Sequence, residues 1–202
     1  MIPLERRSLY TQQWFDSEEH FNQLYPKSIQ ALGSRHWTPL SVARKAAMFL
    51  GLEKNVRILD IGSGVGKFAL AAGFYTPKAS YTGVEQRKYL VEQAEMAKEI
   101  IGLPNVNFIH ANFTQVDFRN YDNFYFYNSF FENLAGKDKI DESIEYSAAL
   151  YDYYNRYLFK KLEQTRAGTR LATFHSLEDE VPPDFCNVGS EMNGLLKYWI
   201  KI

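Results

Sequence analysis

Apolar and polar positions divide most of the chain into short strand-like runs that alternate with helix-like stretches. Strands are predicted where short apolar runs lie between turn-forming residues, at 56–61, 79–84, 105–109, 122–128 and 169–175. Apolar residues at helical spacing predict helices at 67–75, 87–101 and 141–164. Strands separated by helices favour right-handed crossovers. The pattern therefore predicts an α/β domain with a mostly parallel sheet that helices cover on both faces.

The predicted strand 122–128 differs from the others because aromatic residues stand at positions on both of its faces. Its sequence, Asn123-Phe-Tyr-Phe-Tyr-Asn128, does not alternate with charged residues. Strands that are buried on both faces have this composition. We therefore expect this strand near the centre of the sheet, beside strand 56–61.

The last apolar run, residues 195–202, follows Gly189 and Gly194 without a helix long enough for a crossover. A strand reached by such a short connection runs antiparallel to its neighbour. We expect it at a sheet edge, in a hairpin with residues 184–189.

The N-terminal part has a different pattern. Residues 12–36 are polar with spaced aromatic residues, which predicts one or two amphipathic helices laid on a larger body. A further helical pattern runs from Pro39 to Leu50, with Thr38 placed as its cap.

A glycine-rich turn carries the clearest functional signal. Residues 58–66 read Ile-Leu-Asp-Ile-Gly-Ser-Gly-Val-Gly, and Glu85 closes the next predicted strand, about 20 residues after the last glycine. Glycines permit tight turns and leave no β-carbon between the main chain and a ligand. An acidic residue at the end of the next strand can accept both hydroxyls of a ribose. The combination predicts a site for a nucleoside cofactor.

The spacing of the glycines disfavours two common nucleotide sites. Gly62, Gly64 and Gly66 are spaced G-x-G-x-G, and Lys67 stands where the dinucleotide fingerprint requires its third glycine. A phosphate-binding P-loop would need a glycine in place of Ile61 and a hydroxyl residue after Lys67. Hydride-transfer cofactors and P-loop nucleotides are both disfavoured.

With Asp60 two residues before the first glycine, and Glu85 after the second strand, the chain resembles the class I S-adenosylmethionine-dependent methyltransferases. The resemblance implies a Rossmann-like, seven-stranded, mostly parallel sheet with helices on both faces and an antiparallel C-terminal strand. This domain would span 38–202, after an N-terminal helical extension over 1–37. The implied cofactor is S-adenosyl-L-methionine.

The resemblance also implies a set of cofactor-binding residues at the ends of the strands. They are Thr38, Asp60, Gly62, Ser63, Gly64, Gly66, Glu85, Gln86, Asn112, Phe113 and Asn128. Several have a simpler structural explanation. Thr38 suits a helix cap, Asp60 an acceptor for loop amides, Glu85 a cap for the helix near Arg87, and Asn112 an ordinary turn.

The segment Asn128-Ser129-Phe130-Phe131 occupies the position of the family's catalytic fourth motif, so the resemblance implies that these residues orient the acceptor. Amino-directed members often have Asn or Asp followed by Pro-Pro-aromatic, and this chain lacks both prolines. The segment is nearer to that of the non-SET histone-lysine methyltransferases, which share Asp-x-Gly-Ser-Gly-x-Gly and Gly-Val-Glu with this chain. Local turn formation by Asn128 and Ser129 is the alternative.

Two other groups of side chains are weaker candidates. His110 and His175 follow predicted strands and could approach the site, although a lone histidine is more often a surface or cap residue. In the predicted helix 141–164, the set Ile144, Tyr151, Tyr154, Leu158 and Leu162 is expected to pack on the sheet. Three tyrosines outside that set, at 146, 153 and 157, could line a substrate groove.

Composition limits the remaining possibilities. The net charge of -1 gives no general attraction to nucleic acid or to anionic membranes, so neither is an expected partner. Cys186 is the single cysteine, which excludes an internal disulfide. No metal-ligand spacing, apolar leader or run of 18 apolar residues occurs. The chain is therefore expected to be soluble and cytoplasmic.

We thus expect a methyltransferase that acts on a protein side chain or a small molecule. A non-catalytic module that binds S-adenosylmethionine is the alternative. A nucleotide-dependent oxidoreductase is disfavoured by the missing glycine.

Overall fold

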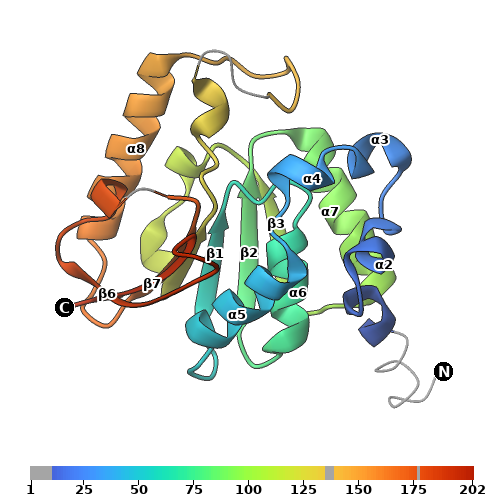
Figure 1. The fold of residues 1–202 in the computed structure, drawn as a ribbon, viewed down its shortest axis with the longest axis horizontal. Coiled ribbons are helices and arrows are strands. Elements are labelled where there is room, and N and C mark those ends of the chain that lie inside the picture. The colour runs from blue at the N-terminus through green and yellow to red at the C-terminus, as the bar shows by residue number, and fades with distance from the viewer. Residues whose placement is uncertain (1–10, 135–138, 177) are drawn as a thin grey trace.

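The computed structural model describes residues 11–134, 139–176 and 178–202, and its centre is a seven-stranded sheet (Figure 1). The strands are β1 (Arg57–Ile61), β2 (Ser80–Glu85), β3 (Val106–His110), β4 (Asn123–Phe126), β5 (Arg170–Phe174), β6 (Phe185–Glu191) and β7 (Leu196–Lys201). Their order is β3-β2-β1-β4-β5-β7-β6. The first five are parallel, whereas β7 runs antiparallel to both β5 and β6. The predicted fold class, including the C-terminal hairpin, is confirmed.

Strand β4 lies at the centre of the parallel part, between β1 and β5. All four of its residues are buried. Phe124 and Phe126 face one layer of core, and Tyr125 faces the other. The two aromatic faces recognised in the sequence are therefore used to fill both layers, as predicted.

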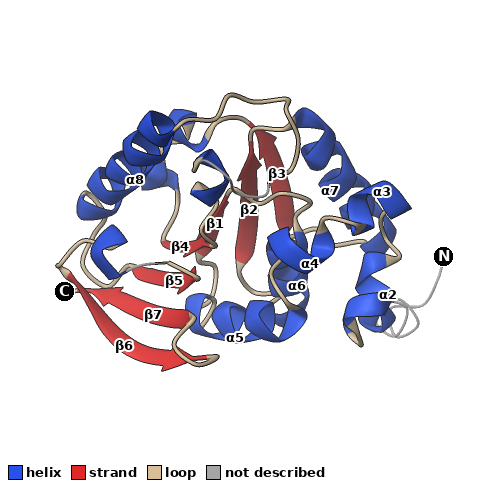
Figure 2. Cartoon of the chain, turned by 45° about the horizontal axis from the view of Figure 1, so that its top comes forward, coloured by secondary structure: helices blue, strands red, loops and turns tan. Residues whose placement is uncertain are grey.

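Helices cover both faces of the sheet (Figure 2). The longer helices are α5 (Leu40–Leu50), α6 (Lys67–Tyr75), α7 (Lys88–Ile101) and α8 (Ala148–Glu163). Helices α5, α6 and α7 contribute to one buried cluster, and α8 contributes to the other. The short 3-10 helices are η1 (Gln13–Phe15), η2 (Phe113–Gln115), η3 (Phe118–Asn120), η4 (Phe131–Asn133) and η5 (Glu178–Glu180).

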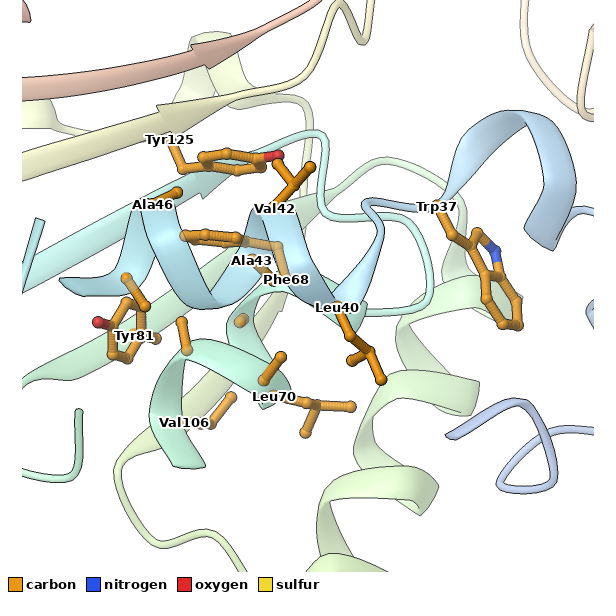
Figure 3. Close-up of a cluster of buried hydrophobic side chains, with 14 of the residues drawn as sticks. Trp37, Leu40, Val42, Ala43, Ala46, Phe68, Leu70, Tyr81, Val106 and Tyr125 are labelled. Carbon is orange, nitrogen blue, oxygen red and sulfur yellow. The ribbon is translucent and has the colours of Figure 1, made fainter. Parts of the chain in front are cut away.

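The buried cluster to which α5, α6 and α7 contribute is built around the close packing of α5 on α6 (Figure 3). Ala43 and Ala46 of α5 are fully buried, and their small side chains let the two helices approach. The Phe68 ring on α6 stacks on the Tyr125 ring of β4, with ring centroids 3.6 Å apart. The beginning of α6, which follows the glycine turn, is thereby fixed against the centre of the sheet.

The N-terminal part forms several short helices where one or two longer helices were predicted. They are η1, α2 (Glu18–Asn22), α3 (Lys27–Gln30) and α4 (Gly33–His36). Phe21 and Trp37 from this part are buried in the same cluster as α5 and α6. The described residues of the predicted extension 1–37 therefore share a core with the sheet domain, and residues 1–10 lie outside the described residues.

Two predicted helix starts are wrong. Helix α5 begins at Leu40 with Pro39 as its N-cap, and the Thr38 hydroxyl lies 3.0 Å from the Tyr125 hydroxyl instead of capping the helix. Helix α8 begins at Ala148, not near 141, because the Ser147 side chain caps it by accepting from the Leu150 N–H.

No helix in the described part of the chain is long and apolar enough to cross a bilayer.

Candidate functional site

A cavity of about 860 Å³ lies at the carboxyl ends of the parallel strands. The strand order reverses between β1 and β4, and ligands of open α/β sheets bind at such a switch point. Every residue predicted to bind the cofactor or to orient the acceptor lines this cavity, except Gly66. The fold therefore brings together side chains from the ends of β1 to β4.

The glycine turn after β1 has the backbone geometry that its sequence predicts. Gly62, Gly64 and Gly66 have φ angles of 74°, 54° and 81°, a region that side chains with a β-carbon rarely adopt. The Val84 carbonyl accepts from the Gly62 and Ser63 N–H groups, each at 3.0 Å, which ties the turn to β2. A β-carbon built on Gly64 would meet nothing within 4 Å, so the middle of the turn is open to a ligand.

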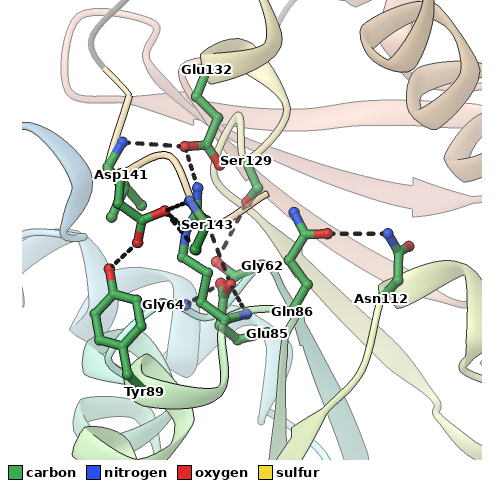
Figure 4. A network of polar contacts seen from close by, with 12 residues as sticks. Gly62, Gly64, Glu85, Gln86, Tyr89, Asn112, Ser129, Glu132, Asp141 and Ser143 are labelled. Atoms are coloured by element: carbon green, nitrogen blue, oxygen red, sulfur yellow. Dashed lines mark hydrogen bonds and ion pairs between the residues drawn. The ribbon is translucent and has the colours of Figure 1, made fainter. Parts of the chain in front are cut away.

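Glu85, at the end of β2, is buried and faces the glycine turn (Figure 4). Its carboxylate accepts from the Gly64 N–H at 3.1 Å and from the Arg87 N–H at 2.8 Å. A carboxylate offers about four lone-pair positions, so about two remain for the hydroxyls of a ribose. Glu85 is not the N-cap of α7, which is Arg87. Burial raises the pKa of Glu85, although both N–H donors and the Arg87 charge oppose this rise.

Asp60, in β1, is 3% exposed, and its Oδ2 atom has no hydrogen-bond partner among the described residues. Burial, and next the nearby charge of Glu85, raise the pKa of Asp60 well above its usual range, while the Ala69 backbone N–H lowers it. A buried carboxyl with an unsatisfied oxygen is costly, and a positively charged ligand group would compensate it. The surroundings of Asp60 thus suit a bound cation, such as an ammonium group.

Replacing Asp60 with Asn is expected to stabilise the free protein and to weaken cofactor binding at least tenfold. The folded pKa of Asp60 is raised, so its favourable contribution is complete below the unfolded pKa and is lost as the pH rises through the folded pKa. The gain in unfolding free energy should therefore be larger at pH 8 than at pH 5. Urea titrations at both pH values measure it, and a variant that is less stable at pH 8 would contradict the assignment.

Asn112, at the start of η2, is held by its own turn. Its side-chain oxygen accepts from the N–H and the hydroxyl of Thr114, and its nitrogen donates to Gln86 Oε1 and to the Tyr154 hydroxyl. Both lone pairs of the oxygen are in use, which matches the turn role that the sequence also allowed. Contact with an adenine amine would require Thr114 to give up one of these bonds. Phe113 stacks on Phe130 at 4.9 Å and gives the cavity an apolar wall suited to a planar base.

The segment after β4 divides into residues that hold the backbone and residues that face the cavity. The Ser129 hydroxyl donates to the Ile61 carbonyl at 2.8 Å, which ties this segment to the end of β1. Phe130 is buried, Phe131 is 40% exposed, and Asn128 has a φ of 33°. Ser129 and Phe130 therefore have evident structural roles, while Asn128 is a polar cavity residue with a positive φ.

Arg87 is the centre of a buried charge network that the sequence did not reveal. Its guanidinium donates to Glu132 Oε2 and to the Tyr146 hydroxyl, each at 2.7 Å, and lies 3.4 Å from Asp141 Oδ1. The Arg87 side chain is 2% exposed. The network fastens the segment after β4, including residues 139–146, to the beginning of α7 beside Glu85.

The N-terminal helices form the wall next to the glycine turn. Lys67, the first residue of α6, forms an ion pair with Glu18 of α2 and lies over the Trp37 ring, 5.3 Å from its centre. The Tyr25 hydroxyl donates to the Val65 carbonyl within the turn at 2.9 Å. The lysine that breaks the dinucleotide fingerprint therefore anchors the N-terminal part of the chain.

A second group of cavity residues lies over β4 and β5. Tyr127 and His175 follow these strands, and Tyr151 donates to Glu180 Oε1 at 2.9 Å. Tyr151 packs against the second buried cluster, as expected, and it also lines the cavity. Burial lowers the pKa of His175 below its usual value of 6.5. No cluster of His, Cys, Asp and Glu in the described ranges could hold a metal ion.

The observed groups fit S-adenosylmethionine. Its ribose would meet Glu85, its base would meet the apolar wall at Phe113, and its ammonium group would compensate Asp60. The open glycine turn leaves room for the cofactor to approach the backbone. Two buried carboxylates beside one cavity favour a ligand that carries positive charge.

Comparison with known proteins identifies the same type of domain. A family model described as a methyltransferase domain matches residues 52–145. A tRNA (guanine-N(7)-)-methyltransferase of Synechococcus sp. (strain JA-3-3Ab) is 36% identical over 94 residues, which are 46% of this chain and 36% of that protein. The same-named protein of Synechococcus sp. (strain JA-2-3B'a(2-13)) is 44% identical over 94 residues, with the same coverage. The chain thus matches about a third of the length of these relatives.

Solved structures share the fold at low sequence identity. TrmN from Thermus thermophilus has a TM-score of 0.57 and 18% identity, over 86% of this chain and 52% of that one. An RNA methyltransferase from Salinibacter ruber, in complex with S-adenosyl-L-homocysteine, has a TM-score of 0.53 and 18% identity, over 82% and 93% of the two chains. Residues 52–145 are thus similar to a methyltransferase domain, and the sheet has the fold of these solved structures.

Proposed function

We propose that the protein is an active methyltransferase whose cofactor lies over the ends of β1, β2 and β3, and whose acceptor lies over the ends of β4 and β5. The observation that carries this proposal is the pair of buried carboxylates, Asp60 and Glu85, on either side of a left-handed glycine turn in one cavity. Strand order separates the two halves of the cavity at the switch point.

The residues of the chain have distinct roles in this proposal. Glu85 accepts the ribose hydroxyls, Asp60 accepts the ammonium group directly or through water, and Phe113 with Phe130 covers the base. S-adenosylmethionine supplies a methyl group on a positively charged sulfur. The protein therefore needs mainly to align the acceptor and to exclude water. Asn128 stands where the two halves of the cavity meet.

Calorimetry of S-adenosylmethionine binding tests the proposal. Glu85→Ala is expected to weaken binding at least tenfold, about 1.4 kcal/mol, because the ribose loses its acceptor. Glu92→Ala is a matched control, since Glu92 lies on the exposed side of α7 and pairs with Lys88. Unchanged affinity in Glu85→Ala, with wild-type unfolding behaviour, would remove the ribose assignment. A nicotinamide dinucleotide is then added as a competitor for S-adenosylmethionine binding. Displacement by the dinucleotide would indicate an oxidoreductase.

Two kinds of acceptor follow from different observations. The near-neutral composition favours a protein side chain or a small molecule. The names of the relatives instead favour an RNA acceptor, whose guanine N7 has a free lone pair and needs no base. Incubation with methyl-labelled cofactor and fractionated cell extract separates these outcomes, according to whether the label enters protein, small molecules or RNA. Binding of the cofactor without any transfer would indicate the non-catalytic module.

A further inference from the structure

The half of the cavity over β4 and β5 combines aromatic and acidic side chains. Tyr127, Tyr151, His175 and Glu180 all line it. The Tyr127 and His175 rings lie 5.7 Å apart, and Glu180 Oε1 accepts a hydrogen bond from the Tyr151 hydroxyl. Aromatic faces and carboxylates together attract organic cations. This half therefore has the composition of a site for a positively charged group.

The segment after β5 is also acidic. Residues 178–180 are Glu-Asp-Glu. Lys197 pairs with Glu178, and the net charge of these residues remains negative. Proteins bind RNA by neutralising phosphates with Lys and Arg. An acidic segment beside the cavity repels a polyanion and attracts a cation.

An additional acceptor atom in the same cavity has no donor. Asn133, in η4, is 5% exposed and lines the cavity. Its nitrogen donates to the Phe130 carbonyl at 2.9 Å, while its Oδ1 atom has no partner among the described residues. Buried acceptors are normally satisfied. A ligand with N–H groups would satisfy this one.

We infer, on the basis of the proposed function, that the methyl acceptor is an amine that is protonated in solution, and that His175 takes up its proton. The two sources of this chemistry are a lysine side chain and a small polyamine. In the reaction, R–NH₃⁺ gives one proton to the neutral imidazole. The nitrogen lone pair of R–NH₂ then forms the C–N bond as the C–S bond breaks and its electron pair remains on sulfur. The products are R–NH₂⁺–CH₃, the thioether and protonated His175.

The position of His175 supports its role as the proton acceptor. It follows β5, has a φ of 57°, and packs edge-on against Phe174 with ring centroids 4.4 Å apart. Burial lowers its pKa, so the imidazole is neutral at pH 7 and can accept a proton. Tyr127 from the end of β4, Tyr151 from α8 and Glu180 from η5 are ionisable groups that share this wall of the cavity.

The first test identifies the methylated product. The full-length protein is incubated with methyl-labelled cofactor and, separately, a lysine-containing peptide pool, spermidine, unmodified tRNA or whole-cell extract. Labelled methyl-lysine after acid hydrolysis indicates a protein source, and labelled methyl-polyamine indicates a small molecule. Label only in nucleosides or carboxyl esters, or no labelled amine from any source, would overturn the inference. A different result would refute the proposed function itself: wild-type protein that does not bind S-adenosylmethionine.

Substitutions test the two named side chains. Glu180→Gln keeps an acceptor for Tyr151 but removes the charge, so KM for the amine should rise at least fivefold with little change in cofactor affinity. Glu19→Gln, on the exposed face of α2, is the matched control. If His175 is the base, wild-type kcat should level off above its lowered pKa, in the acidic range, whereas the kcat of His175→Gln should keep rising towards the pKa of a free amine, about 10.4. Identical pH profiles would overturn the role of His175.

Discussion

Arg87→Met is expected to lower the free energy of unfolding at pH 7 by about 3–5 kcal/mol. The guanidinium is almost fully buried and contacts three carboxylates, those of Glu85, Glu132 and Asp141. Methionine fills a similar volume but leaves these carboxylates without a counter-charge. The cost is therefore mainly that of uncompensated buried charge rather than of a cavity. Urea denaturation at pH 7 measures the loss.

Two comparisons make the result specific to the charge network. Lys88→Met removes the neighbouring cation, whose partner Glu92 is exposed, and should change stability by about 0.5 kcal/mol or less. Lowering the pH towards 4 protonates Glu85, whose pKa is raised by burial, so the difference between wild type and Arg87→Met should shrink. A loss below about 1 kcal/mol at pH 7, or a difference that grows on acidification, would contradict this account.

The sheet could be predicted from the sequence because its signals are local. Each parallel strand is a short apolar run between turn residues, and each boundary agrees with the structure within two residues. The aromatic residues on both faces of β4 identified it as a central strand, and burial on both faces is the reason for that composition. The glycine turn was equally accessible, because three positive φ angles in five residues require a particular residue type.

The Arg87 network could not be predicted, since its partners are distant in sequence. Glu132 and Asp141 lie 45 and 54 residues from Arg87, and no local pattern pairs them. The late start of α8 has a related cause. Asp141 accepts from the N–H and hydroxyl of Ser143 and from the Tyr89 hydroxyl, so its side chain stabilises a turn where a helix was predicted.

Only part of the candidate site could be predicted from the sequence. Residues at strand ends could be placed beside one another because the topology of a parallel sheet determines where the strands end. The hydrogen-bond partners of each side chain could not be predicted, because they are distant in sequence. Asn112 illustrates this, because Tyr154, which satisfies its nitrogen, comes from α8 on the other side of the cavity. A tyrosine in a long helix gives no sequence signal that it will approach a particular turn.

Gly66→Ala is expected to destabilise the protein by about 2–5 kcal/mol, clearly more than Gly102→Ala, which should cost about 1–2 kcal/mol. The two glycines have nearly the same φ, 81° and 79°, so the backbone strain from a β-carbon is matched. They differ in their surroundings. A β-carbon on Gly66 would lie 2.4 Å from Phe108 Cζ, whereas one on Gly102 would meet nothing within 4 Å. Chemical denaturation of both variants isolates the steric cost.

Phe108→Leu provides the decisive control for this comparison. Leucine lacks the ring atoms that the new β-carbon would overlap, so the double variant should recover about 1 kcal/mol relative to the sum of the single losses. Because Phe108 is in β3 and Gly66 is the N-cap of α6, the coupling would show that the glycine is required for the helix to approach the sheet, in addition to its positive φ. Equal losses in Gly66→Ala and Gly102→Ala, without coupling to Phe108, would leave backbone conformation as the full explanation.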